Sequence, residues 1–114
     1  MSPTQRSLAY LRKVGYTVAV TEKWNHITHT RQDLWAFGDL LAFRPGVPVM
    51  IVQTTTAANR AARRRKLLAN ATAKLWVQAG GACVLHAWAR RGGRGEKKTW
   101  DPNPEWLQED QFDD

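Results

Sequence analysis

The sequence contains a single cysteine, Cys83, and this scarcity excludes several classes of protein. One cysteine forms no internal disulfide and argues against a zinc site built from thiolates, so we expect Cys83 to be a small buried hydrophobe. No apolar run approaches the roughly 20 residues of a membrane-spanning helix, and we expect no membrane partner. The N-terminus lacks the pattern of a secretory signal peptide, which favours a cytoplasmic protein. P-loop, dinucleotide-binding and Ser-His-Asp patterns are absent as well.

Acidic residues are scarce over most of the chain. Residues 1–104 hold all 17 Lys and Arg but only five of the ten acidic residues, whereas the last ten residues hold five acids and no base. A body this basic favours a polyanionic partner, and nucleic acid is the commonest one. We divide the chain into a single domain, 1–101, and an acidic C-terminal tail, 102–114. The tail either solubilises the protein or lies over the basic surface when DNA is absent.

Hydrophobic periodicity and turn residues predict an ordered set of elements. They are a helix from residues 2–5 to Gly15, strands over 16–21, 39–44, 48–55 and 82–89, a helix over 57–79, an edge strand over 97–100 and a helical turn over 105–108. Residues 24–36 show no clean period, which predicts a loop. Two strands that flank a long helix indicate a crossover. We therefore expect an α/β protein with a mixed central sheet and flanking helices.

Two polar side chains stand out on the predicted hairpin. Asp39 opens its first strand, and Gln53 lies late in its second. Oxygen ligands on neighbouring strands can hold a hard divalent cation. Each residue also has a structural alternative. Asp39 would then cap a turn or pair with an Arg, and Gln53 would be a buried, hydrogen-bonded amide. Asp33, in the loop before them, is either a further ligand or a local partner of Arg31.

Positive charge is concentrated directly after this hairpin. Five cations fall within the seven residues from Arg60 to Lys66. Because they repel one another, a phosphate partner is a more economical account than a solvated helix face. Arg90, Arg91 and Arg94 form a second basic patch in a Gly-rich stretch, which is either a second phosphate contact or a mobile hairpin tip. His26 and His29 are predicted to be solvated loop residues.

The stretch from Arg31 to Ala42, followed by Val52-Gln53-Thr54-Thr55, Asn59 and Arg63, resembles the PD-(D/E)XK nuclease superfamily. In particular, it is similar to a small phage-type branch related to Holliday junction resolvases. The resemblance covers roughly residues 4 to 100 and implies an αβββαβ(β) core like that of restriction endonucleases. It also implies Mg²⁺ or Mn²⁺ as cofactor, DNA as partner, and a homodimer by analogy. If the protein is phage-encoded, we expect it to act in the cytoplasm of the host cell.

The chemistry of this family uses an Asp on the second strand, an acid on the third and a Lys two positions later. Asp39 matches the first position, Gln53 falls on that of the acid, and Thr55 falls on that of the Lys. The resemblance thus implies Asp39, Gln53 and Thr55 as catalytic positions. It implies Asp39 and Gln53 as metal ligands, with Asp33 as a further carboxylate. A hydroxyl at Thr55 supplies no positive charge, so Arg63 or Lys66 is the expected substitute.

The partner is expected to be DNA, bound mainly through its phosphate backbone. The residues expected to contact it are Arg31, Asn59, Arg60, Arg63, Arg64, Lys66, Arg90, Arg91 and Arg94. The expected function is a metal-dependent DNA endonuclease, with branched or Holliday junction DNA as a candidate substrate. The alternative is a nuclease fold that has lost catalysis and acts by binding nucleic acid or by regulation, and Thr55 in place of Lys favours it. A third reading is a module whose basic face meets an acidic protein surface.

Overall fold

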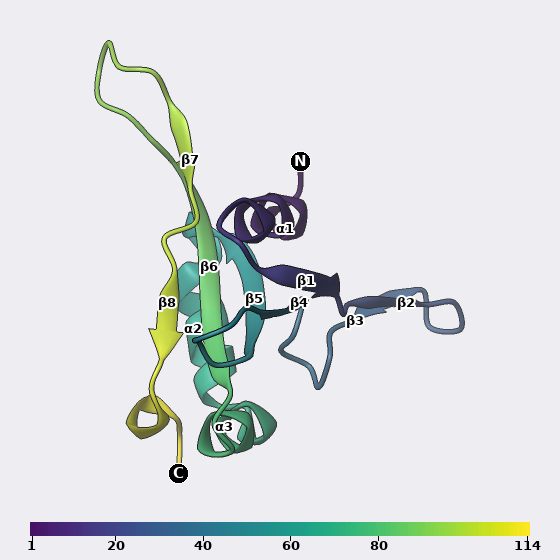
Figure 1. Cartoon of the computed structure of the whole chain (residues 1–114). Helices are drawn as coiled ribbons and strands as arrows, with labels where there is room; N and C mark the ends of the chain where they lie inside the picture. The colour runs from purple at the N-terminus through teal and green to yellow at the C-terminus, as the bar shows by residue number, and fades with distance from the viewer.

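A curled mixed sheet and three α-helices form the fold in the computed structural model, which describes all 114 residues (Figure 1). The helices are α1 (Pro3–Lys13), α2 (Arg60–Leu68) and α3 (Ala71–Gln78). The main sheet contains β1 (Thr17–Val20), β4 (Leu40–Phe43), β5 (Met50–Thr56), β6 (Ala82–Arg91), β7 (Thr99–Asp101) and β8 (Glu105–Leu107). The predicted α/β class is confirmed. None of the helices combines the length and apolar character needed to span a membrane.

β5 and β6 form the centre of the sheet. The strand order is β1-β4-β5-β6-β7. β8 also pairs with β6, along Cys83–Leu85, whereas β7 pairs with β6 along Ala89–Arg91. β5 and β6 run parallel from the pair Met50↔Ala82 to the pair Thr56↔Trp88, whereas all other pairs are antiparallel. Parallel neighbours require a long connection, and α2 and α3 provide it together with a 3-10 turn, η1 (Ala57–Asn59). The predicted crossover is therefore present.

The two faces of the sheet carry separate hydrophobic clusters, because successive side chains of a strand point to opposite faces. Met50 and Val52 of β5 pack with Leu11 of α1. Ile51, between them in the sequence, packs with Leu67 of α2 on the other face. Cys83 also lies in that second cluster, where burial raises its pKa to about 12, so it is the buried hydrophobe that the sequence predicts.

A buried polar group fixes α1 against the sheet. The Ser7 hydroxyl lies 2.8 Å from His86 Nδ1 and accepts a hydrogen bond of 2.8 Å from Trp88 Nε1. Burial lowers the pKa of His86 to about 4, so its ring is neutral at pH 7. Nδ1 can then accept a hydrogen bond from the Ser7 hydroxyl. The N-terminus of α1 is closed by a capping box, in which the Gln5 N–H donates to Ser2 Oγ. These contacts place the first turn of α1 at one end of β5.

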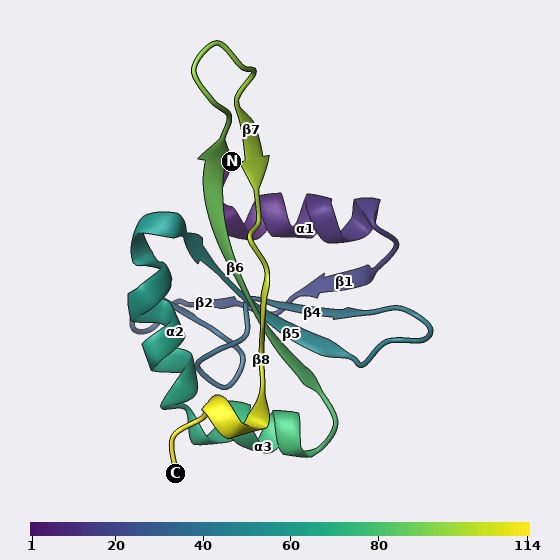
Figure 2. The same cartoon turned by 90° about the vertical axis from the view of Figure 1, so that its left-hand side faces the viewer.

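The helix predicted over 57–79 is divided into two. α2 ends at Leu68, and Asn70 begins α3 by accepting a hydrogen bond of 3.0 Å from the Ala73 N–H. Asparagine is among the best N-cap residues, so its side chain favours a new start over helix continuation. The break turns α3 away from α2 beneath the sheet (Figure 2).

The segment predicted to be a loop contains a two-stranded hairpin. β2 (Lys23–Asn25) pairs with β3 (Thr30–Gln32), and both strands are largely exposed. With neither face buried, the strands have no alternation of polar and apolar residues that a sequence pattern would reveal. The loop prediction for this part of residues 24–36 is thus wrong.

The C-terminal residues pack on the body of the protein. Residues 105–107 form β8, which pairs with Cys83–Leu85 of β6, instead of the predicted helical turn. A 3-10 turn, η2 (Glu109–Gln111), follows. Leu107 and Phe112 are 3% and 5% exposed, and both join the cluster under α2 and α3. Part of the segment described above as an acidic tail therefore belongs to the core.

Gly38 provides a test of how closely the backbone just before Asp39 is packed. A Cβ added at Gly38 would lie 2.8 Å from Cγ2 of Ile51 and 3.1 Å from Cβ of Leu34. We expect Gly38→Ala to lower the free energy of unfolding by ~1–3 kcal/mol, measured by urea denaturation, because the core must shift to admit the methyl group.

The matched control is Gly93→Ala in the exposed β6–β7 hairpin, where the nearest atoms belong to the flexible side chain of Glu96. This variant should stay within about 0.5 kcal/mol of the wild type. Equal losses in the two variants would contradict the packing argument.

Candidate functional site

Asp39 is a buried carboxylate held by three donors of β5. It directly precedes β4 and is only 4% exposed. Its Oδ2 accepts hydrogen bonds from the Gln53 side-chain amide at 3.0 Å, from the Thr54 N–H at 2.7 Å and from the Thr54 hydroxyl at 3.1 Å. The antiparallel pairing of β4 with β5 brings these groups together. The position of the carboxylate is thus fixed by the sheet itself.

Burial is the main cause that raises the pKa of Asp39 to about 8, and the neighbouring carboxyl group of Asp33 contributes to the rise. The hydrogen bond from the Thr54 N–H acts in the opposite direction but is outweighed. Near neutral pH the Asp39 carboxyl group therefore retains its proton unless a cation replaces it.

Two further carboxylates lie beside Asp39. Glu22, Asp33 and Asp39 each offer one oxygen atom, and these three atoms lie within 4.8 Å of one another. Both ends of the β2–β3 segment are attached next to Asp39. The Thr21 N–H donates to the Asp39 carbonyl, and the Leu34 N–H donates to that of Gly38, each at 2.9 Å. Three carboxylate oxygens at this spacing could together hold a metal ion.

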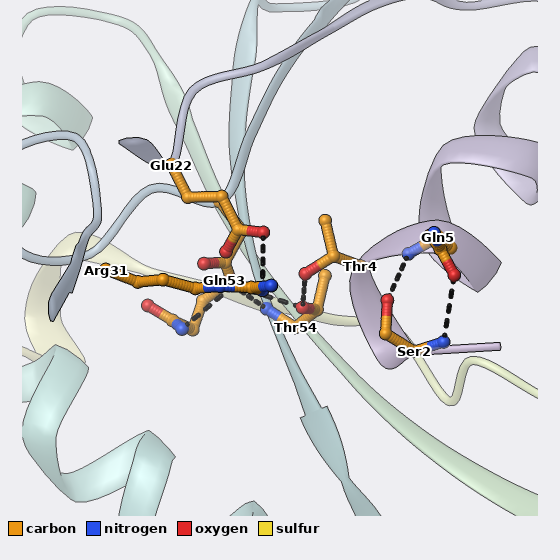
Figure 3. Close-up of polar contacts among 8 residues, drawn as sticks. Ser2, Thr4, Gln5, Glu22, Arg31, Gln53 and Thr54 are labelled. Atoms are coloured by element: carbon orange, nitrogen blue, oxygen red, sulfur yellow. Dashed lines mark hydrogen bonds and ion pairs between the residues drawn. The ribbon is translucent and has the colours of Figure 1, made fainter. Parts of the chain in front are cut away.

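The three acids open into a polar cavity of about 370 Å³. The first turn of α1 contributes Ser2 and Thr4, and β5 contributes Gln53 and Thr54 (Figure 3). The hydroxyls of Thr4 and Thr54 lie 2.8 Å apart and join the helix to the strand. Because the lining is mostly polar and includes no hydrophobic residue, the cavity suits a small charged group better than an apolar ligand.

Three cations line the same cavity. Arg31 Nη1 lies 3.3 Å from Glu22 Oε1, while Arg63 and Lys66 reach the cavity from α2. The five ion pairs of the structure do not include Arg63 or Lys66. Their charges remain available to an anion that approaches the carboxylates. The arrangement can therefore hold a cation and a phosphate side by side.

The structure brings the predicted metal ligands Asp39, Gln53 and Asp33 into this one cavity. The Gln53 amide nitrogen donates to Asp39, which is the buried, hydrogen-bonded alternative from the sequence. Thr55 is 6% exposed and is not among the residues that line the cavity, whereas Thr54 is. Glu22 was not predicted, although it is one of only five acids in residues 1–104.

The predicted nucleic-acid contacts fall into separate groups. Arg31, Arg63 and Lys66 line the cavity. Arg60 and Arg64 instead pair with Glu105 of β8, at 2.9 and 2.7 Å. Burial raises the pKa of Glu105, but the hydrogen bonds and charges of Arg64 and Arg60 lower it overall.

The remaining predicted contacts lie on exposed parts of the chain. The side chain of Asn59 donates to the Thr56 hydroxyl just before α2. Arg90, Arg91 and Arg94 belong to the β6–β7 hairpin, which extends away from the body in both views (Figures 1 and 2). Arg90 lies over the ring of Trp100, and Arg91 pairs with Asp101 at 3.2 Å.

No protein-family model matches the chain, and no curated protein or solved structure matches it either. The residues of this chain and their geometry are therefore the basis on which its function is inferred.

The raised pKa of Asp39 predicts how stability depends on pH. Because this pKa is about 8 in the folded protein against 3.8 as its ordinary value, the folded state holds a proton that the unfolded chain releases. The stability contributed by this group is complete below pH 4 and is lost as the pH rises through 8. Without metal, Asp39→Asn should be more stable than the wild type, with a gap that widens from pH 5 to pH 9 in urea denaturation with EDTA.

The control is Asp110→Asn, an exposed acid of the C-terminal turn. It should follow the wild type at every pH. A constant or narrowing gap between Asp39→Asn and the wild type would contradict the assigned pKa direction.

Proposed function

We propose that this protein is a metal-dependent nuclease that hydrolyses phosphodiester bonds of DNA. One observation carries the proposal: the oxygens of Glu22, Asp33 and Asp39 converge within 4.8 Å in a cavity that Arg63 and Lys66 also line. Carboxylates hold Mg²⁺ or Mn²⁺, and Arg and Lys bind phosphate oxygens. Both halves of the chemistry thus have residues at one place.

The residues have distinct roles in this proposal. Glu22, Asp33 and Asp39 are the ligands of the cation, which would supply an activated water and neutralise charge on the phosphate. Gln53 positions Asp39 through its amide. Arg63 and Lys66 hold the phosphate and take the place of the Lys that the nuclease motif has where this chain has Thr55. The Thr54 hydroxyl and N–H keep the Asp39 carboxylate oriented.

The order of elements supports a finer proposal for the fold. In the main sheet a helix, three antiparallel strands (β1, β4, β5), a helical crossover and a parallel strand (β6) occur in this order, with the separate β2–β3 hairpin inserted between β1 and β4. The PD-(D/E)XK superfamily, which the sequence resembles, is expected to have this order, and we propose that the chain is a member of it. By the same resemblance we propose branched DNA as a substrate and a homodimer as the acting form.

A second candidate is a nuclease fold that binds DNA without cutting it. The observation that favours it is the buried Thr55 outside the cavity, together with a neutral amide at Gln53 where the family has an acid. In this case the cavity would still bind a cation and a phosphate.

A cleavage assay decides between the two candidates. Supercoiled, linear and four-way-junction DNA are incubated with Mg²⁺, Mn²⁺ or EDTA and with the wild type, Asp39→Asn or Asp110→Asn. We expect cutting that requires metal, falls at least ~100-fold in Asp39→Asn and is unchanged in Asp110→Asn, because only the first variant removes a ligand charge. Binding without cutting in every metal would support the second candidate.

The contribution of the two cavity cations is tested through salt dependence. Arg63→Ala with Lys66→Ala should weaken DNA binding and reduce the slope of log affinity against log salt concentration by about two. The matched control is Arg12→Ala with Lys13→Ala, which removes the same charge at the far end of α1. If the control pair lowers the slope as much as the cavity pair does, the effect is one of net charge and the cavity is not the binding site.

A further inference from the structure

Trp35 is presented to solvent by a constrained turn between β3 and β4. The side chain is 55% exposed, and Trp35 and Ala36 have φ angles of 50° and 66°. Left-handed backbone is uncommon for residues other than glycine and carries an energetic cost for a bulky one. Backbone strain of this kind is typical of ligand-binding positions.

Hydrogen bonds hold the turn in this conformation. The N–H groups of Ala36 and Phe37 donate to the carbonyls of Asp33 and Leu34, at 3.2 and 3.0 Å. The side chain of Asn70, the N-cap of α3, donates to the Trp35 carbonyl at 3.2 Å. The position of the ring is thus set by two elements, the turn and the start of α3.

The Trp35 ring is only partly used for packing. It lies 6.5 Å from the Phe37 ring and 6.4 Å from the Trp76 ring, measured between centroids. The rest of it contributes to a cavity of about 400 Å³, which Arg31, Asp33, Ala36 and Lys66 also line. An aromatic surface therefore lies next to two cations, in a space large enough for a small planar ligand.

This cavity adjoins the acidic one. Arg31, Asp33 and Lys66 line both of them. A phosphate held between the carboxylates and Lys66 would therefore place a neighbouring nucleoside toward Trp35. Nucleobases stack on aromatic side chains without regard to sequence, because every base has a flat π surface.

We propose that the Trp35 cavity binds an unpaired nucleobase next to the phosphate held in the acidic cavity. This inference rests on the proposed function and narrows its substrate class to single-stranded DNA or to branched DNA with unpaired nucleotides. In a continuous duplex both faces of each base are covered by its neighbours, so the Trp35 ring has no base to stack on. The half-exposed Trp100 ring is less suitable, because the Arg6 guanidinium covers it at 3.8 Å.

The test is DNA binding without metal, measured by fluorescence anisotropy in EDTA. The probes are a labelled single-stranded thymidine oligonucleotide and a blunt duplex. Trp35→Leu keeps an apolar contact for Phe37 and Trp76 but removes the aromatic face. It should weaken single-strand binding about tenfold and duplex binding less than twofold, and Trp35→Phe should recover most of the loss. The matched control, Trp106→Leu, alters a tryptophan of similar exposure on β8 and should leave both affinities unchanged.

A second measurement uses only wild-type protein and does not depend on the folding of a variant. Replacing the thymidines of the oligonucleotide with abasic residues keeps its phosphates and removes its bases. The wild type should then bind about tenfold more weakly. Equal affinity for the two strands, or equal losses by Trp35→Leu on single strand and duplex, would overturn the inference. Because no step requires cleavage, this outcome is distinguishable from failure of the proposed nuclease activity.

Discussion

The pairing of β5 with its two neighbours is the constraint on which the rest of the structure depends. Antiparallel pairing with β4 brings Asp39 to the amide of Gln53 and the N–H of Thr54. Parallel pairing with β6 requires a crossover, and the crossover begins at the end of β5 where these residues lie. α2 is therefore placed so that Arg63 and Lys66 reach the same cavity as Asp39. One strand thus positions Asp39 and the two cavity cations together.

Much of the fold could be predicted because its central elements bury a face. Strands near 48–55 and 82–89 have enough apolar residues to be recognised, and a crossover follows from the helix between them. The elements that the sequence did not reveal depend on tertiary contacts. The β2–β3 hairpin is exposed on both faces, and β8 is a strand because β6 has an edge available at Cys83–Leu85. β2, β3 and β8 are each three residues long, and a strand this short shows no recognisable hydrophobic periodicity.

The candidate site was predictable in part for the same reason. Gln53 lies on β5 and Asp39 directly precedes β4, so the resemblance to the nuclease pattern pointed to both positions. Glu22 joins them only because backbone hydrogen bonds of Thr21 and Leu34 close the β2–β3 segment onto Gly38 and Asp39. Likewise, nothing in the run of cations shows that Glu105 will pair with Arg60 and Arg64. β8 supplies that acid from more than forty residues away. Two of the arginines of α2 are thus paired with Glu105, whereas Arg63 and Lys66 face the cavity.

The acidic cluster opposes stability, and this opposition bears on its function. Folding moves the Asp39 carboxyl group out of water and next to Asp33, and both effects raise its pKa, so near neutral pH it keeps its proton. A neutral side chain of the same shape would form the same contacts without that penalty. A buried carboxyl group that lowers stability in this way is typical of functional sites, where a bound ligand compensates its charge. Under the proposed function, a divalent cation would do so by replacing the proton and neutralising the carboxylates. The strained turn at Trp35 is a second place where the fold accepts an energetic cost. It lines a cavity that shares Asp33 and Lys66 with the acidic cavity. Two independent departures from local stability thus meet at one place, and cation, phosphate and base would be bound there together.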